Sequence, residues 1–314
     1  MRRVGVCWGA WFLAACQGAP PSETSSNVVD VWHARRSLQD EVDRDPTRVL
    51  ISLLPIHYCG ATIARRVVIQ GGGATIVACP NNPAPIPGLT QLQAGIVLQP
   101  GADGSVFEGL RFEGRGVAQD TARALTFGIF SRNVNNVRVL ENRVDGTVQA
   151  ITDAGGDGWL IESNHVRDLE VFGCGPVGLC SGGDAIVVEH ARTGNASADD
   201  SVVHKNHIST LAPPAGLIFS MTGIIAVSVQ RPLIADNEIT MDGSPTIGIE
   251  FTRTTGGGFI NAPCGEATFL ENDISGADKA VDVSLDCLSG TVGNPNPASV
   301  VFDVLTVPAR PLGL

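Results

Sequence analysis

Histidine and acidic side chains recur at fixed distances from a repeated asparagine, and they are the side chains best suited to catalysis or metal binding. Four of them stand two residues before or one residue after Asn164 or Asn206: Glu162, His165, His204 and His207. Imidazoles with a carboxylate in reach can bind zinc or serve as general acid and base. If the two asparagine segments are adjacent in the fold, these side chains form one patch. The alternative is a solvated polar face.

Carboxylates form a second candidate group. Glu250 and Asp282 each lie in a short apolar segment, and stacking of these segments would bring like charges within roughly 5 Å of each other. Such a pair needs an ion or a shared proton, and calcium is the ion that suits oxygen ligands. The same pair could hydrolyse a glycoside with retention of configuration. Glu189 would lie one column away, and Asp184 ends the Gly-rich turn Ser181-Gly182-Gly183-Asp184.

Two sets of candidate residues follow from these patterns. The expected catalytic residues are Asp184, Glu189, His204 and His207. The expected metal ligands, with calcium as the one cofactor that the pattern favours, are Glu162, His165, Glu250 and Asp282. No coordination spacing beyond His204-x-x-His207 accompanies them.

A repeated phrase must position these side chains. It has an apolar residue three before an Asn and a β-branched residue two after it, and it occurs at Asn142, Asn164, Asn206, Asn237 and Asn272. The unequal gaps between these asparagines indicate a short unit that accepts insertions. A second apolar segment, such as Ala185-Ile186-Val187-Val188, accompanies each phrase, which predicts stacked coils of β-strands with one shared core. Asn suits a corner because it tolerates a left-handed backbone, and stacked amides can hydrogen-bond along the axis.

At these phrases the chain resembles the right-handed parallel β-helix proteins of the pectin-lyase-like superfamily, from about Ser37 to the C-terminus. The resemblance implies an all-β fold, a single right-handed parallel β-helix solenoid. Helical spacing from Val28 to Val42 predicts a short N-terminal capping helix over the open end of the stack. The resemblance does not fix a reaction, because the superfamily includes lyases, hydrolases, epimerases and proteins without known chemistry. The turn before Asp184 has one Asp where the polygalacturonase-type hydrolases have two, and their other motifs are missing.

The first sixteen residues predict export. Arg2-Arg3 precedes an apolar run, and Leu13-Ala14-Ala15-Cys16 resembles the bacterial lipobox. This resemblance implies cleavage before Cys16, a lipid on its thiol, and anchoring to a membrane of the cell envelope, with Gln17 favouring the outer membrane. We expect a lipoprotein signal peptide at 1–15, a flexible tether at 16–27 and the parallel β-helix domain at 28–314.

Six cysteines remain outside the signal and the lipid site. An even number in an exported protein predicts disulfides. Proximity in the sequence favours the pairs Cys59 with Cys79, Cys174 with Cys180, and Cys264 with Cys287. Other pairings of the six remain open at this point.

Charge and composition limit the partners. The formal net charge is −11, and an acidic chain without a basic stripe is a poor nucleic-acid binder. We expect a monomer that binds or modifies a polysaccharide, as a lyase or a glycoside hydrolase, in a groove bordered by insertions at Glu170 to Gly183 and Leu211 to Met221. A polyuronate substrate would need a local basic site. The competing interpretation is a non-catalytic structural or adhesion lipoprotein whose polar columns are only solvated faces.

Overall fold

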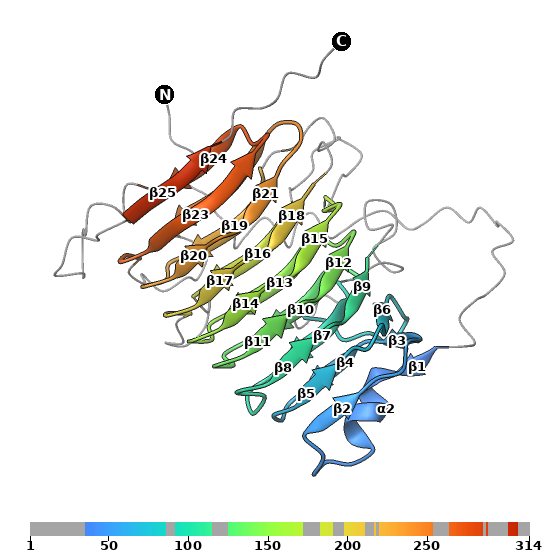
Figure 1. Ribbon diagram of the computed structural model, residues 1–314. Coiled ribbons are helices and arrows are strands. Elements are labelled where there is room, and N and C mark those ends of the chain that lie inside the picture. The colour runs from blue at the N-terminus through green and yellow to red at the C-terminus, as the bar shows by residue number, and fades with distance from the viewer. Residues whose placement is uncertain are drawn as a thin grey trace, which may run out of the picture.

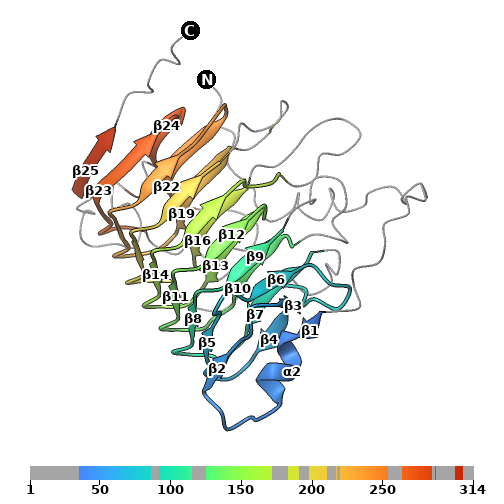
Figure 2. The ribbon, with the colours of Figure 1, turned by 45° about the vertical axis from the view of Figure 1, so that its right-hand side comes forward.

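The computed structural model describes residues 35–85, 92–114, 125–171, 183–190, 198–210, 217, 220–253, 264–284, 287 and 301–306. Strands in these ranges pair in parallel and form a sheet of 17 strands, here sheet A, and a sheet of 8 strands, sheet B. Figures 1 and 2 show them stacked in order from β2, beside the helix, to β25. The fold is a right-handed parallel β-helix, which confirms the predicted fold class.

Sheet A consists of two rows of strands that meet at a corner. The first row contains β2 (Leu50–Ser52), β5 (Val68–Gln70), β8 (Val106–Glu108), β11 (Arg138–Leu140), β14 (Leu160–Glu162), β17 (Val202–His204) and β20 (Leu233–Ala235). The second row contains β1 (Arg36–Ser37), β3 (His57–Cys59), β6 (Thr75–Val77), β9 (Arg111–Glu113), β12 (Arg143–Asp145), β15 (His165–Arg167), β18 (His207–Ser209) and β21 (Glu238–Thr240). Two long strands run through both rows, β23 (Thr268–Ser275) and β25 (Val301–Thr306).

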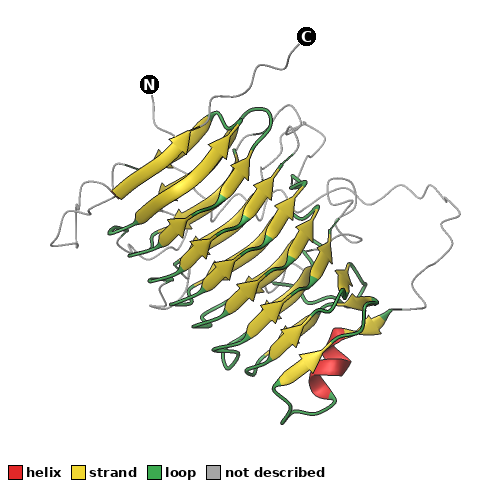
Figure 3. Ribbon diagram, viewed as in Figure 1, coloured by secondary structure: helices red, strands yellow, loops and turns green. Residues whose placement is uncertain are grey.

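Sheet B closes each coil. Its strands are β4 (Ala61–Ile63), β7 (Ala94–Leu98), β10 (Phe127–Ser131), β13 (Gln149–Ala154), β16 (Asp184–Glu189), β19 (Met221–Val227), β22 (Thr246–Thr252) and β24 (Lys279–Val283). One coil therefore reads as first row, second row and sheet B, as in β11, β12 and β13. Figure 3 shows that strands dominate the described part of the chain.

The core is built from columns of apolar side chains that point into the coil. The first row contributes Val139, Ile161, Val203, Ile234 and Phe269; the second row contributes Val144, Val166, Ile208, Ile239 and Ile274; sheet B contributes Ile129, Ile151, Ile186, Ile224 and Ile249. All of these side chains are at most 2% exposed. Burial of one such aliphatic side chain contributes about 1.5–3 kcal/mol, so stacking rather than local propensity stabilises the strands.

The repeated asparagines form the predicted ladder at the corner between the two rows. Asn142 Nδ2 donates to Asn164 Oδ1 at 3.0 Å, and Asn164 Nδ2 donates to Asn206 Oδ1 at the same distance. The series continues through Asn237 to Asn272, and these side chains are at most 1% exposed. Each amide oxygen thus also finds a donor on the neighbouring coil, so the buried amides are satisfied without water.

The expected left-handed conformation lies one residue earlier than predicted. Positive φ angles of 51° to 57° occur at the residue before each ladder position: Glu141, Ser163, Lys205, Asp236 and Glu271. In the coil where Leu110 takes the ladder position, Gly109 has a φ of 65°. The residue before the Asn makes the bend, while the Asn itself supplies the inward amide.

A short helix, α2 (Leu38–Asp43), covers the first coil with the buried side chains of Leu38 and Val42. The prediction of a helix from Val28 is wrong at residues 36 and 37, which form β1 and pair with β3. Ser37 ends the extended segment, because its backbone is extended and its side chain accepts a hydrogen bond from the Asp40 N–H as an N-cap. Residues 28–34 lie outside the described residues.

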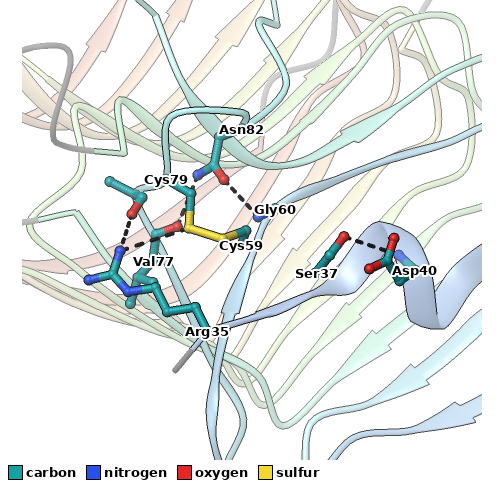
Figure 4. The surroundings of a disulfide bond; sticks show 9 residues. Arg35, Ser37, Asp40, Cys59, Gly60, Val77, Cys79 and Asn82 are labelled. Atoms are coloured by element: carbon teal, nitrogen blue, oxygen red, sulfur yellow. Dashed lines mark hydrogen bonds between the residues drawn. A yellow bond between two sulfur atoms is a disulfide. The ribbon is translucent and has the colours of Figure 1, made fainter. Parts of the chain in front are cut away.

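Disulfides join cysteines near both ends of the described stack. Cys59 is bonded to Cys79 in the first coils (Figure 4), and Cys264 is bonded to Cys287 in the last coils. The Asn82 side chain reinforces the first bridge, since it donates to the Val77 carbonyl and accepts from the Gly60 N–H. The predicted pair Cys174 with Cys180 lies outside the described residues.

Residues 1–34 also lie outside the description, so the predicted signal peptide, tether and lipid site at Cys16 remain predictions. Among the described elements, no helix has the length and apolar character needed to cross a membrane.

Candidate functional site

The outward columns of sheet A follow the predicted alignment. Strand register places His165 beside His207 and then Glu238, and it places Glu162 beside His204. The coils of Asn164 and Asn206 are therefore adjacent, as the patch required. The separation of 42 residues between these asparagines does not disturb the stack.

His204 lies between two carboxylates on the surface of sheet A. Its Nδ1 is 3.1 Å from Glu162 Oε1, and its Nε2 is 2.7 Å from Asp236 Oδ2. Ionised carboxylates only accept hydrogen bonds, so both contacts are satisfied together when the imidazole carries two protons. His204 therefore joins three successive coils through its contacts with the two carboxylates. In this geometry each ring nitrogen faces a carboxylate oxygen, and a catalytic role of His204 stays a prediction.

His165 and His207 stack on one another with ring centroids 4.6 Å apart. Burial lowers the pKa of His165, and the positive charges of His207 and Arg143 lower it further. His207 Nδ1 lies 2.9 Å from Glu238 Oε2. Two imidazoles of the predicted patch, His165 and His207, thus stack on one another, and His204 and His207 contact nearby carboxylates.

The predicted metal ligands lie on two different faces. Glu162 and His165 belong to sheet A, whereas Glu250 and Asp282 belong to sheet B. Across the described ranges, no three His, Cys, Asp or Glu side chains are grouped so that they could hold a metal ion. Metal binding by these four residues stays a prediction.

Sheet B carries the predicted carboxyl pair in register. Glu250 of β22 pairs with Asp282 of β24 on the next coil, so the two residues are about one strand spacing, roughly 4.8 Å, apart. Lys279 Nζ lies 2.6 Å from Asp282 Oδ2 and supplies a positive charge beside the pair. A lysine thus lies beside the pair for which the sequence predicts an ion, such as calcium, or a shared proton.

The two carboxyl groups of the pair differ in environment. Burial raises the pKa of Glu250 to about 7, and the charge of Asp282 adds to the rise while Lys279 opposes it. The Asp282 side chain is 39% exposed and is bound to Lys279. Near neutral pH, Glu250 is therefore able to hold a proton beside an accessible, ion-paired carboxylate.

Asp184 lies further along the same sheet, at the start of β16. It pairs in register with Gln149 on one side and Thr222 on the other. Gln149 Nε2 donates to Asp184 Oδ2 at 3.3 Å, and Thr152 Oγ1 donates to Gln149 Oε1 at 3.0 Å. Burial raises the pKa of Asp184 to about 8, with a further rise from the charge of Glu250. A buried carboxyl without a cation in contact thus retains its proton at neutral pH.

The predicted catalytic set separates into two groups. Asp184 and Glu189 lie at opposite ends of β16, while His204 and His207 lie in neighbouring strands of sheet A. The charge of Glu250 acts on Asp184. Within the described part of the chain, the hydrogen-bond partners of Asp184 are on sheet B, and the carboxylates that contact His204 and His207 are on sheet A or next to it. Gln149 and Thr222 were not identified from the sequence as polar partners of Asp184. Gln149 lies seven residues after Asn142 and begins the next strand.

The two long insertions are largely undescribed. Residues 172–182 and 211–216 lie outside the described residues. The groove that they were expected to border therefore remains a prediction.

Comparison with known proteins shows structural likeness alone. No family model matches the chain, and no curated protein matches its sequence. A variant of the catalytic domain of a GH87 alpha-1,3-glucanase in complex with tetrasaccharides is similar at 12% identity and a TM-score of 0.35, over 93% of this chain and 70% of that chain. The catalytic domain of a GH87 alpha-1,3-glucanase in complex with nigerose gives 12% identity, a TM-score of 0.29 and the same coverage. Similarity at this level identifies no substrate for the present chain.

Proposed function

We propose that this protein hydrolyses glycosidic bonds of a polysaccharide, with Glu250 as the general acid and base and Asp282 as the nucleophile. The observation that carries the proposal is the register of Glu250 with Asp282 on successive coils. Retaining glycosidases place two carboxyl groups about 5–5.5 Å apart, and one strand spacing of roughly 4.8 Å is close to that value.

The environments of the two residues support these roles. A general acid must hold a proton near the working pH, and burial raises the pKa of Glu250 to about 7. Lys279 Nζ lies 2.6 Å from an oxygen of Asp282, the proposed nucleophile, and supplies a positive charge beside it. Two neighbouring carboxyl groups in different environments, one buried and one exposed beside a lysine, fit the pattern of an acid and a nucleophile.

The reaction takes two steps. Glu250 donates its proton to the glycosidic oxygen as the bond from the anomeric carbon to that oxygen breaks, and an Asp282 oxygen bonds to the anomeric carbon. In the second step the Glu250 carboxylate removes a proton from water, the water oxygen bonds to the anomeric carbon, and Asp282 is released. Glu250 ends protonated, so no further reactant is consumed.

The test is hydrolysis of a panel of neutral and acidic polysaccharides by the wild type, Glu250→Gln and Asp282→Asn. Loss of the acid is expected to lower the rate by about a thousandfold. Wild-type activity is expected to decline as pH rises through about 7, because Glu250 then loses its proton. Glu238→Gln, a variant of an exposed carboxylate on sheet A, is the matched control and should leave the rate unchanged.

The stereochemistry of the products separates this mechanism from others. Retention of the anomeric configuration, followed by NMR, is expected from a covalent intermediate on Asp282. Inversion, or equal activity of Glu250→Gln and the wild type, would contradict the assignment.

A non-catalytic structural or adhesion role is the second candidate. The ion pairs of His204 with Glu162 and Asp236 favour it, because they turn part of the outer face of sheet A into a fixed network. This role requires that the wild type degrade none of the polysaccharides and still bind one of them.

We infer that the protein works in the cell envelope, anchored by a lipid at Cys16, in the outer membrane. The lipobox-like start supports this location, and so do the disulfides of Cys59 with Cys79 and Cys264 with Cys287, because disulfides persist in oxidising compartments. Labelling of cells with a palmitate analogue should mark the wild type and should not mark Cys16→Ala.

A further inference from the structure

Three arginines converge on one carboxylate on the outer face of the second row of sheet A. They come from β9, β12 and β15, which Figure 1 shows next to one another. Arg143 Nε lies 3.0 Å from Asp145 Oδ2, Arg167 also binds Asp145, and an Arg111 terminal nitrogen lies 3.5 Å from Asp145 Oδ2. The Asp145 side chain is only 1% exposed, whereas the three guanidinium side chains are 35% to 43% exposed.

The cluster has more donors than its carboxylates use. Among the described residues, the three guanidinium groups contact two carboxylates, Asp145 and Glu113. Glu113 lies 3.1 Å from Arg111. Arg111 Nε is buried and has no hydrogen-bond partner within the described part of the chain. A ligand cannot reach this buried nitrogen, but each guanidinium has five N–H donors, and the exposed parts of the three side chains can donate to an acceptor from a ligand.

The surroundings confine an anion to this end of the face. Along the same outward column, Arg111 and Arg143 are followed by His165 and His207, and then by Glu238 and Asp273. The acidic end repels an anion, while the arginine end attracts it. Because the whole chain carries a formal charge of −11, binding of a polyanion needs such a local site.

We propose that Arg111, Arg143 and Arg167 bind a carboxylate or sulfate group of an anionic glycan. Arginine forks match both groups with paired N–H donors. The arginines supply a means of binding a glycan that the described aromatic side chains do not supply. Trp159, the only tryptophan among the described residues, is fully buried. The inference rests on the proposed function only in taking the ligand to be a glycan, and it concerns a face other than that of Glu250.

The test is binding to three polymers with the same backbone: dextran, carboxymethyl-dextran and dextran sulfate. The polymers are immobilised, and biolayer interferometry measures the dissociation constant of the purified protein for each of them. This measurement does not require catalysis. The wild type is expected to bind one or both charged polymers and not dextran, and the preferred polymer distinguishes carboxylate from sulfate. Added NaCl should weaken the binding.

Arg111→Gln is the decisive variant, because Arg111 makes the longest of the three contacts to Asp145 and its loss disturbs the ion pairs least. It should weaken binding about tenfold or more, the loss expected for a hydrogen bond to a charged group. Arg138→Gln removes an exposed arginine from β11 of the same sheet and is the matched control for net charge. Equal affinities of Arg111→Gln and Arg138→Gln, or no binding of the wild type to either charged polymer, would overturn the proposal.

Glu250→Gln separates this inference from the proposed function. Undiminished binding by that variant, with or without hydrolytic activity of the wild type, supports an independent anion site on sheet A. Binding that is lost in Glu250→Gln and kept in Arg111→Gln would place the ligand on sheet B and contradict the inference.

Discussion

Asp145 and Asp184 lie on outward columns of adjoining faces, and both are almost completely buried. The Asp145 side chain is 1% exposed and Asp184 is 3% exposed. Asp145 is surrounded by arginines: burial alone would raise its pKa, but hydrogen bonds from Arg167 and Arg143 outweigh burial and lower it. Asp184 has an amide and a hydroxyl as partners, and burial raises its pKa to about 8.

The difference shows that arginines beside a carboxyl group can outweigh the effect of burial on its ionisation. Cations from adjacent coils fix Asp145 as an anion, whereas Asp184 and Glu250 on sheet B keep protons near neutral pH. Groups that can exchange a proton at neutral pH suit general acid and base chemistry. In our proposals, sheet B is the face that carries the reaction, and the arginine end of sheet A is the face that recognises charge.

Removal of the charge at Asp145 should have the largest effect on stability. Asp145→Asn leaves three guanidinium groups together without their shared counterion, and the free energy of unfolding at pH 7 should fall by about 3 kcal/mol. Urea unfolding followed by circular dichroism measures the change. Glu113→Gln, which removes a more exposed partner of Arg111, should cost less than about 1 kcal/mol. Equal losses in the two variants would show that burial of Asp145 adds nothing.

The two carboxyl groups should give opposite pH dependences. Asp184 has a raised pKa in the folded state, so between about pH 4 and 8 the folded protein binds a proton that the unfolded chain does not. In this range Asp184 makes the free energy of unfolding fall with rising pH, by up to about 1.4 kcal/mol per pH unit. Asp184→Asn should remove that slope from urea unfolding measured across the range. Asp145 has a lowered pKa, so its contribution is present above about pH 4 and is lost as pH falls through its folded value. An unchanged slope in Asp184→Asn would mean that this side chain is already ionised at neutral pH.

The exposed ion pairs of sheet A should matter least. His204→Gln loses its contacts to Glu162 and Asp236, yet these side chains are 23% to 38% exposed, and we expect a loss of about 0.5–1 kcal/mol that shrinks in 1 M NaCl. His57→Gln, a variant of an exposed histidine in β3, is the control and should change little. If His204→Gln lowered the free energy of unfolding as much as Asp145→Asn does, buried and exposed charges on this sheet would not differ in their effect on stability.

Much of the scaffold was predictable because each coil repeats one phrase. The spacing around Asn164 and Asn206 gave the correct neighbours for His165, His204 and Glu162, and the apolar segments gave the pairing of Glu250 with Asp282. The start of the helix was not predictable from apolar spacing, because strand pairing of β1 with β3 overrides it.

The site was predictable only in part. The partners of Asp184 were missed because insertions of unequal length hide which segments of sheet B align. The arginine cluster could have been found by extension of the outward column by two residues, since Asp145 and Arg167 follow Arg143 and His165 at that distance. The effect of the arginines on the pKa of Asp145 depends on burial, and a repeat pattern does not show how deeply a side chain is buried.

The asparagine ladder also has a consequence for how such a protein can evolve. In the coils of β8 to β21, two residues separate the strand of the first row from that of the second row, and an added residue there would shift the amides out of contact. Successive ladder positions are nonetheless 22, 42, 31 and 35 residues apart. In these coils the length differences accumulate outside that tight corner, toward the edges of sheet B. Natural selection can therefore remodel the surroundings of Asp184 and Glu250 by lengthening loops, while the inherited core and its ladder stay unchanged.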